Sequence, residues 1–307
     1  MVIVPKGSHI KVQIQLKEII EGLSSTGFSQ IALVHTIYGR PKVNEDRAEI
    51  ALPSSLWTTI TSSANCGVKI LRRIHIVLEN LSDSGIYVLN GPYDSLLKEY
   101  DLISISPRND STFQATCASA TIADIITLDY TTRGIRLPYR IRPADVKAAV
   151  SRCAAFEIPL APGLLHLKQR RALLQTCREL QKSYLGMAPD ILFSSGDRTF
   201  EESDVGTMAF RMPGDISNLA HAVLQFDTTI AHKAVWSNGS AIIKRAKDRK
   251  WGKSDVINVA FRHQSDDVKV SSSKTKEEQS APIKAKSSVE SESESEDDAI
   301  DDGFIAM

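Results

Sequence analysis

The stretch RLPYRIRPADVKAAVSRCAAFEIPL, residues 136–160, shows a pattern that the rest of the chain repeats. Apolar residues recur at helical spacing within 144–154, charged residues fall on the opposite face, and Pro143 stands where the first turn of a helix tolerates proline. The next residues, 155–158, form a short, mostly apolar run of the kind found in strands buried on both faces. The stretch therefore predicts a helix followed by a strand of an α/β protein.

Similar apolar, β-branched runs recur on both sides of this unit, with helical patterns between them. They lie at residues 31–34, 70–78, 102–105, 123–128, 155–158, 191–193 and 241–243. Strands that alternate with helices pair in parallel through crossovers. One more strand near the start, at 2–4 or at 10–14, would complete a (β/α)8 TIM-like barrel with a degenerate first strand. An open doubly wound sheet is the competing architecture, but the sequence has no G-x-G-x-x-G turn and no P-loop.

The formal net charge of zero hides a division between two parts of the chain. Residues 264–307 carry twelve acidic and five basic side chains, a net of −7, while residues 1–263 carry 32 basic and 25 acidic, a net of +7. The tail is mostly Ser, Lys, Glu and Asp, and it cannot bury enough apolar surface to offset chain entropy. We expect a folded barrel domain at 1–255 and a disordered acidic tail at 256–307. The basic domain favours a polyanionic partner.

Two classes of protein are disfavoured by the sequence. No apolar run approaches the roughly 20 residues of a membrane helix, and the first residues lack the apolar core of a signal peptide, so we expect neither a membrane partner nor secretion. The four cysteines include no C-x-x-C pair, which argues against a zinc site and a disulfide scaffold.

A metal-dependent hydrolase built on a barrel would need several His, Asp or Glu side chains at the carboxyl ends of its strands, often beginning with a His-x-His pair. The sequence has no such pair. The polar groups at the predicted strand ends are His35, Glu79, Ser106, Asp129, Glu157, and Ser194 with Ser195. We interpret His35 as a hydrogen-bonded structural residue and His75 as a packed one. The sequence therefore predicts no catalytic residue and no metal ligand.

Basic residues form three clusters, at residues 133–152, 168–182 and 244–253, the last with Trp251 nearby. Phosphate contacts need Lys or Arg projecting from a fixed surface, and a guanidinium group can bind two oxygens at once. Arg140 and Arg142 lie beside prolines on a stiff extended segment. Each cluster could equally be the solvated face of its helix or loop, but three on one basic domain favour binding of RNA or DNA through its backbone and shape.

Residues 136–160 resemble the thirty-kilodalton protein subunit family of eukaryotic ribonuclease P and RNase MRP, in which a basic-Leu-Pro segment precedes a helix ending in Arg and a strand with an apolar-Glu pair. The similarity is collinear over about residues 30–245. Its further segments are 69–78, 100–107 and 123–128 for strands, 169–171 for a double Arg, 190–198 for a strand and turn, and 215–241 for the last two helices and a closing strand. The chain departs from the family by lacking its Asp-Leu-Asn-type first strand.

The resemblance implies a barrel of the polymerase and histidinol phosphatase (PHP) type without metal ligands. It also implies a non-catalytic subunit that binds ribonuclease P or MRP RNA, precursor tRNA and other protein subunits, including a small Pop5-like partner, in the nucleus and nucleolus. The catalytic RNA would hold Mg²⁺ and remove the 5′ leader of precursor tRNA, and the chain itself would bind no cofactor. The candidate RNA contacts from the resemblance and the third cluster are Arg136, Arg140, Arg142, Arg152, Arg170, Arg171, Arg198, Lys244 and Arg245.

Three other interpretations remain. An active metal-dependent phosphoesterase of the same barrel superfamily is the main alternative, and a scaffold that binds only proteins is another. In the tail, Ser291, Ser293 and Ser295 each have an acidic residue three positions on, the pattern that an acid-directed kinase favours. These serines are candidate phosphorylation sites, although the tail can equally serve only to solubilise the chain.

Overall fold

In the computed structural model the described residues are 2–3, 9–55, 58, 68–88, 90–132, 134, 136–184, 186–187, 189–194 and 211–251. The chain divides into two units, Met1–Asn258 and Val259–Met307, and every described residue belongs to the first. Arg198, the predicted tail at 256–307 and its three candidate phosphorylation sites lie outside the described residues. The predicted domain boundary at 255 therefore stays a prediction.

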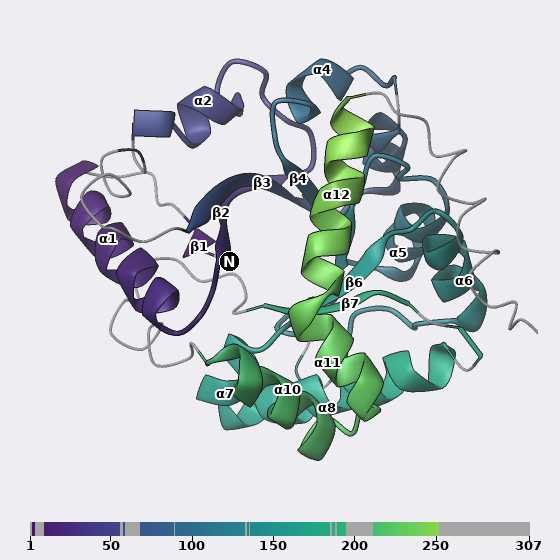
Figure 1. Ribbon diagram of the computed structural model, residues 1–307. Helices are drawn as coiled ribbons and strands as arrows, with labels where there is room; N and C mark the ends of the chain where they lie inside the picture. Colours follow the sequence, from purple (N-terminus) through teal and green to yellow (C-terminus); the bar gives the residue numbers. More distant parts are fainter. Residues whose placement is uncertain are drawn as a thin grey trace, which may run out of the picture. The chain divides into compact units, whose positions relative to one another are not determined.

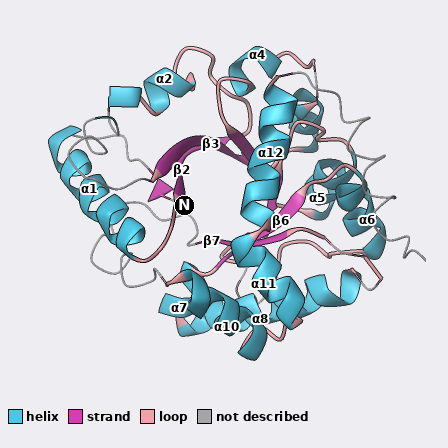
Figure 2. Cartoon of the chain, in the orientation of Figure 1, coloured by secondary structure: helices cyan, strands magenta, loops and turns pink. Residues whose placement is uncertain are grey.

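The described strands form one parallel sheet in which each strand pairs with the next in the sequence, and Figure 2 shows how the sheet curls inside a layer of helices. The strands are β1 (Val2–Ile3), β2 (Gln30–Tyr38), β3 (Lys69–Leu78), β4 (Leu102–Pro107), β5 (Ile125–Thr127), β6 (Ala155–Pro159) and β7 (Ile191–Ser194). Sequential order in a curled parallel sheet is the arrangement of a TIM-like barrel. The predicted barrel-type α/β fold is confirmed.

Helices connect the strands, and most of them cover the outside of the sheet, whereas the last one crosses the curled sheet (Figure 1). They are α1 (His9–Ser25), α2 (Ala48–Ala51), the 3-10 helix η1 (Leu81–Tyr87), α4 (Asp94–Leu97), α5 (Asp110–Ala118), α6 (Pro143–Ser151), α7 (Ala161–Leu165), α8 (Leu167–Ser183), α10 (Pro213–Ala222), α11 (Thr228–Trp236) and α12 (Asn238–Lys250). The helix predicted within 144–154 is confirmed as α6, with Pro143 in its first turn.

The structure resolves two points about the predicted strands. The predicted strand at 241–243 is wrong, because these residues lie inside α12. Its buried residues Ile242 and Ala246 are four positions apart, which is a helical spacing, and a three-residue apolar run cannot by itself distinguish a strand from a helix. Of the two candidate first strands, residues 2–3 form β1 beside β2, whereas 10–14 belong to α1.

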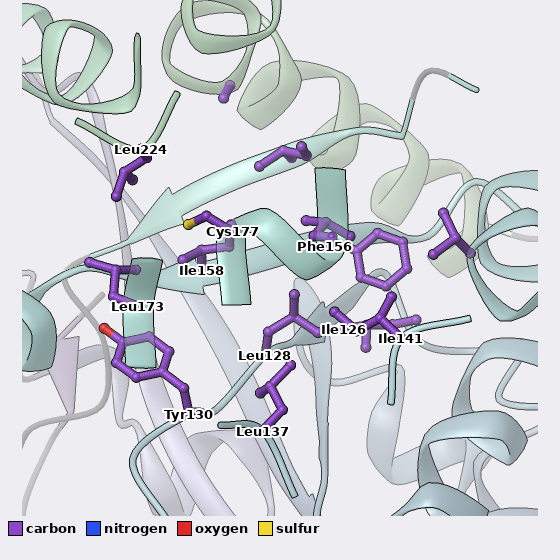
Figure 3. Close-up of a cluster of buried hydrophobic side chains, with 14 of the residues drawn as sticks. Ile126, Leu128, Tyr130, Leu137, Ile141, Phe156, Ile158, Leu173, Cys177 and Leu224 are labelled. Atoms are coloured by element: carbon purple, nitrogen blue, oxygen red, sulfur yellow. The ribbon is translucent and has the colours of Figure 1, made fainter. Parts of the chain in front are cut away.

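The largest apolar core lies between β5, β6 and β7 and the helices that cover them. Figure 3 shows Leu128 and Ile158 of this core beside Leu173 and Cys177, which come from α8. All four side chains are buried, and full burial of one Leu or Ile contributes about 1.5–3 kcal/mol. This packing fixes the ends of the strands, from which the candidate site residues project.

Candidate nucleic-acid interface

The face of the sheet opposite the helix-covered one carries a buried polar network. Arg73 of β3 and Glu157 of β6 form a bidentate ion pair in which Nη1 lies 2.8 Å from Oε1, and their side chains are 4% and 1% exposed. The Arg73 Nε donates to Ser104 Oγ at 2.8 Å, and Thr127 Oγ1 donates to Glu157 Oε2 at 2.6 Å. His75 Nδ1 is 2.9 Å from the same Ser104 hydroxyl. Five residues from four strands therefore hydrogen-bond one another inside the sheet.

The network fixes the charge of its members. Burial alone would raise the pKa of Glu157, but the Arg73 charge and the hydrogen bonds from Arg73 and Thr127 outweigh it and lower the pKa to about 2. Burial, with the nearby Arg73 charge, lowers the pKa of His75 to about 4. At neutral pH the network therefore holds one cation, one anion and a neutral imidazole. The expectation that His75 is packed is confirmed.

This interior is poorly suited to a divalent cation. Glu157 is already paired with a guanidinium group, and Asp129, at the end of β5, is paired with Arg108. His35 points to the other side of the sheet, where its Nε2 lies 2.8 Å from Asp46 Oδ1, so its interpretation as a hydrogen-bonded structural residue is confirmed. Among the described residues, no group of three or more His, Cys, Asp or Glu side chains could hold a metal ion.

Five of the predicted RNA contacts lie exposed beyond the carboxyl ends of β5 and β6. Three belong to the connection from β5 to α6, and two are the fourth and fifth residues of α8, which follows β6 and α7. We call them the carboxyl-end surface, and they are Arg136, Arg140, Arg142, Arg170 and Arg171. A parallel sheet places the loops that follow adjacent strands side by side, which is why residues 30 apart in sequence share one surface.

Hydrogen bonds and buried side chains hold the two loops of the carboxyl-end surface in place. Gln169 Nε2 donates to the carbonyl oxygen of Thr131 at 3.3 Å, which joins the start of α8 to the β5 loop. The backbone N–H of Arg140 donates to Asp110 Oδ1 at 3.0 Å, and the buried ring of Tyr139 stacks on Phe113 with centroids 4.5 Å apart. The arginines thus extend from a fixed backbone, and the guanidinium of Arg170 also donates to the carbonyl oxygens of Gly163 and Leu164 of α7, at 3.3 and 3.1 Å.

Arg152 has a different position from the carboxyl-end arginines. Its guanidinium donates to the backbone carbonyls of Thr116, Cys117, Ala120 and Ala123, at 2.6–3.2 Å, and so binds the carboxyl end of α5 and the turn after it. Burial lowers the pKa of this guanidinium. This geometry favours a structural role for Arg152.

The third basic cluster lies on α12, at the opposite end of the strands. Three of its cations are paired with aspartates that directly precede β7, β5 and β4. The pairs are Arg245 with Asp190, Arg249 with Asp124, and Lys250 with Asp101, at 2.6, 2.8 and 3.3 Å. Figure 1 shows α12 running across the curled sheet in the foreground. Of the two predicted contacts on this helix, Lys244 is exposed and Arg245 is tied to the fold.

Sequence reasoning missed the three aspartates that receive these cations. A signal was present, because each Asp immediately precedes an apolar strand run, in Asp101-Leu, Asp124-Ile and Asp190-Ile. Asp101 and Asp124 also each accept a backbone N–H from the neighbouring strand, at 2.9 and 2.8 Å. Their cation partners, more than 50 residues away in the chain, could not be read from local sequence.

Fold and site together define a barrel-type α/β protein. Its described residues offer an exposed arginine surface at the strand ends and a buried ion pair in the interior. No described helix is both long and apolar enough to cross a membrane. Residues 7–251 match the sequence model of a protein family that is described as RNase P subunit p30. The chain belongs to this family, as its resemblance predicted, and membership supports a role in ribonuclease P.

Individual relatives agree with the family match. The chain is 24% identical over 246 residues to the mouse ribonuclease P protein subunit p30, a match that spans 80% of this chain and 84% of the mouse protein. It is 28% identical to Dictyostelium discoideum ribonuclease P protein subunit drpp30, over 69% of this chain and 56% of that one. It is 26% identical to the probable ribonuclease P protein subunit 3 of Schizosaccharomyces pombe, over 62% and 73%.

Among solved structures, an organophosphorus hydrolase from Deinococcus radiodurans is similar to the chain with a TM-score of 0.43 and 9% identity, over 78% of this chain and 86% of that one. A likeness of that size carries no functional information.

Proposed function

We propose that this chain is a non-catalytic, RNA-binding protein subunit of ribonuclease P, and of RNase MRP, that supports removal of the 5′ leader from precursor tRNA by the catalytic RNA. Its partners in this proposal are the ribonuclease P or MRP RNA, precursor tRNA and other protein subunits, including a small Pop5-like one. The RNA holds the Mg²⁺ ions, and the complex acts in the nucleus and nucleolus.

The observation that carries the RNA-binding part of the proposal is the carboxyl-end surface. Its five arginines are exposed on the connection from β5 to α6 and at the start of α8, which hydrogen bonds tie to α5 and to the loop after β5. Arginine binds phosphate well because its planar group donates two parallel hydrogen bonds and never loses its charge. A fixed array of such groups can therefore follow a phosphate backbone without reading bases, which suits a subunit that recognises the shape of a folded RNA.

The barrel interior supports the non-catalytic part. A metal hydrolase of this architecture needs an open cation site at the carboxyl ends of the strands. Here the carboxylate of Glu157 and the guanidinium of Arg73 neutralise each other, and both side chains are almost fully buried. The purified chain is expected not to hydrolyse a phosphomonoester when manganese or zinc is added. Turnover that disappears in His35→Ala would establish the phosphoesterase alternative instead.

Salt-dependent RNA binding tests the proposal directly. The full chain should bind precursor tRNA or ribonuclease P RNA with an affinity that falls steeply as salt rises, because each neutralised phosphate releases counterion. Replacing Arg140 and Arg142 together by Gln should weaken binding and lower the slope of log K against log salt by up to about 2, since each contact contributes about 0.7–0.9.

The matched control removes two positive charges from the same domain without touching the carboxyl-end surface. Arg178 and Lys182 are exposed further along α8, and their double replacement by Gln changes the net charge by the same amount. If this control weakens binding as much as the Arg140 and Arg142 variant, the surface has no special role. An RNA affinity that does not change with ionic strength would contradict the proposal as a whole.

A further inference from the structure

Helix α12 has two faces of different character. Ile242 and Ala246 are buried against residues at the amino ends of the strands, including Leu71 and Leu102. On the opposite side, Lys244, Lys247 and Trp251 are exposed, and Trp251 is 78% exposed. Positions three and four residues apart share one face of a helix, so these three side chains form a single outward row. We call this row the α12 surface.

The fold holds the α12 surface rigidly. The three ion pairs to strand-leading aspartates lie on the sides of the helix that face the sheet, and Asn238 Nδ2 donates to the carbonyl oxygen of Ile191 at 2.9 Å. The buried pair Arg249 and Asp124 is bidentate, with both contacts at 2.8–3.0 Å. These pairs use the inward cations, so the lysines of the outward row are the ones left facing solvent.

The chemistry of the α12 surface suits one class of ligand. Lys244 and Trp251 are seven residues apart, which places them about 10 Å apart along the helix axis. Proteins that bind single-stranded nucleic acids combine exposed aromatic rings with basic side chains, because bases stack on the rings while phosphates contact the cations. The exposed indole ring and the ammonium groups of the α12 surface form such a combination. A stack of this kind accepts any base, so the surface selects an unpaired strand rather than a sequence.

We propose that the α12 surface is a second RNA-binding surface that takes a short single-stranded segment, with Trp251 stacking on a base and Lys244 and Lys247 beside phosphates. The proposal rests on the RNA-binding function above and extends it. The carboxyl-end surface and the α12 surface lie at opposite ends of the strands, of which β4 with its six residues is about 20 Å long. One chain therefore contacts two separate RNA segments and holds them at a fixed spacing.

The lysines also have a purely structural explanation, since cations near the carboxyl end of a helix favour its dipole by a few tenths of a kcal/mol. That explanation predicts a small change in stability and none in RNA affinity. It says nothing about Trp251, whose exposed ring contributes little to the fold. Binding measurements on folded variants therefore separate the two explanations.

The test uses the full chain, an unstructured labelled oligouridylate as the single-stranded probe, and precursor tRNA as the structured one. Trp251→Ala should weaken oligouridylate binding about five-fold or more, from the range measured for stacked bases. The Lys244→Gln, Lys247→Gln double variant should lower the salt slope for this probe by up to about 1.4. Trp236→Ala, at an exposed position of α11, is the matched control for Trp251→Ala, and the Arg178→Gln, Lys182→Gln double variant on α8 is the control for the two lysines. Both controls should leave oligouridylate affinity unchanged.

A bridging assay completes the test, with one RNA immobilised and a second, labelled RNA captured through the chain. Loss of capture in Trp251→Ala, with precursor tRNA binding retained, supports the proposal. If the α12 variants match the parent on every RNA while the Arg140 and Arg142 variant is weakened, the second surface is refuted and the proposed function stands. If neither set of variants changes RNA binding, both fail. An α12 variant that loses affinity for polyglutamate but not for RNA would assign the surface to an acidic protein and overturn the proposal.

Discussion

Arg73→Met should destabilise the fold strongly, because it removes the only cation paired with the buried Glu157 carboxylate among the described residues. The two side chains are 4% and 1% exposed, so water cannot replace the lost guanidinium. Breaking a buried ion pair from one side typically costs about 3–5 kcal/mol, whereas replacing both partners by apolar residues of similar volume is often neutral. The double variant Arg73→Met, Glu157→Leu should therefore recover most of the loss.

The pKa of Glu157 indicates a loss in the free energy of unfolding of similar size. Its folded pKa is about 2 and its ordinary value is 4.5, so the ionised carboxylate stabilises the fold above pH 4.5 and this contribution disappears as the pH falls toward 2. A shift of that size corresponds to about 3 kcal/mol. Without Arg73, burial would be opposed mainly by the hydrogen bond from Thr127, and we expect it to raise the pKa of Glu157 above its ordinary value. The stability difference between parent and Arg73→Met should then narrow as the pH falls from 7 toward 4.

Urea unfolding followed by circular dichroism measures these differences, with thermal unfolding as a cross-check. A loss of 3–5 kcal/mol corresponds to a Tm lowered by roughly 6–20 °C for a domain of this size. A single variant that loses less than about 1 kcal/mol would refute the reasoning, and so would a double variant as unstable as the single one. Arg73→Lys provides a control that keeps the charge but loses the bidentate geometry, and it should fall between the parent and Arg73→Met.

Three further outcomes follow from other residues. The pKa of His75 lies at about 4 in the fold, below its ordinary 6.5, because burial disfavours its charged form, so stability should be lost as the pH falls from about 6.5 to 4, and His75→Gln should flatten that part of a urea-unfolding pH profile. Arg152→Met should cost at least about 2 kcal/mol, because four backbone carbonyls lose a charged donor, while the salt slope of RNA binding by the folded protein stays the same. Phosphopeptide mapping of the chain isolated from cells should find phosphate on Ser291, Ser293 or Ser295, and three unmodified serines would end that idea.

The strands could be predicted because buried parallel strands have a distinctive sequence pattern. Runs such as 70–78 and 102–105 are dense in β-branched residues, which suit strands that pack on both faces, and they recur with helical segments between them. The failure at 241–243 has the complementary cause. The apolar residues Ala-Ile-Ile are compatible with a strand and with a helix. They are helical because Ile242 and Ala246 pack on strand residues that lie up to about 170 positions away in the chain.

The candidate site could be predicted only in part, because the sequence gives the number of charged side chains but not their orientation in the fold. Arg140, Arg142, Arg170 and Arg171 end up exposed together since the loops after β5 and β6 are neighbours in a parallel sheet. Arg152 comes from the same basic segment, yet the fold turns its guanidinium onto backbone carbonyls. The exposed Arg170 also donates to two backbone carbonyls, so tertiary contacts decide which guanidinium groups bind the fold and which face only solvent.

The same distinction changes the meaning of the basic domain's surplus charge. On α12, Arg245, Arg249 and Lys250 lie next to aspartates of the sheet, so their charges are neutralised locally and hold the helix in place. The net charge of +7 over residues 1–263 already includes those aspartates, which means that the surplus resides in other side chains. Exposed arginines at the carboxyl ends of the strands and exposed lysines on α12 account for part of it, and the two sets belong to opposite ends of the strands. A basic domain arranged in this way would attract a polyanion from two sides, whereas one with the same net charge on a single face would bind from one side only.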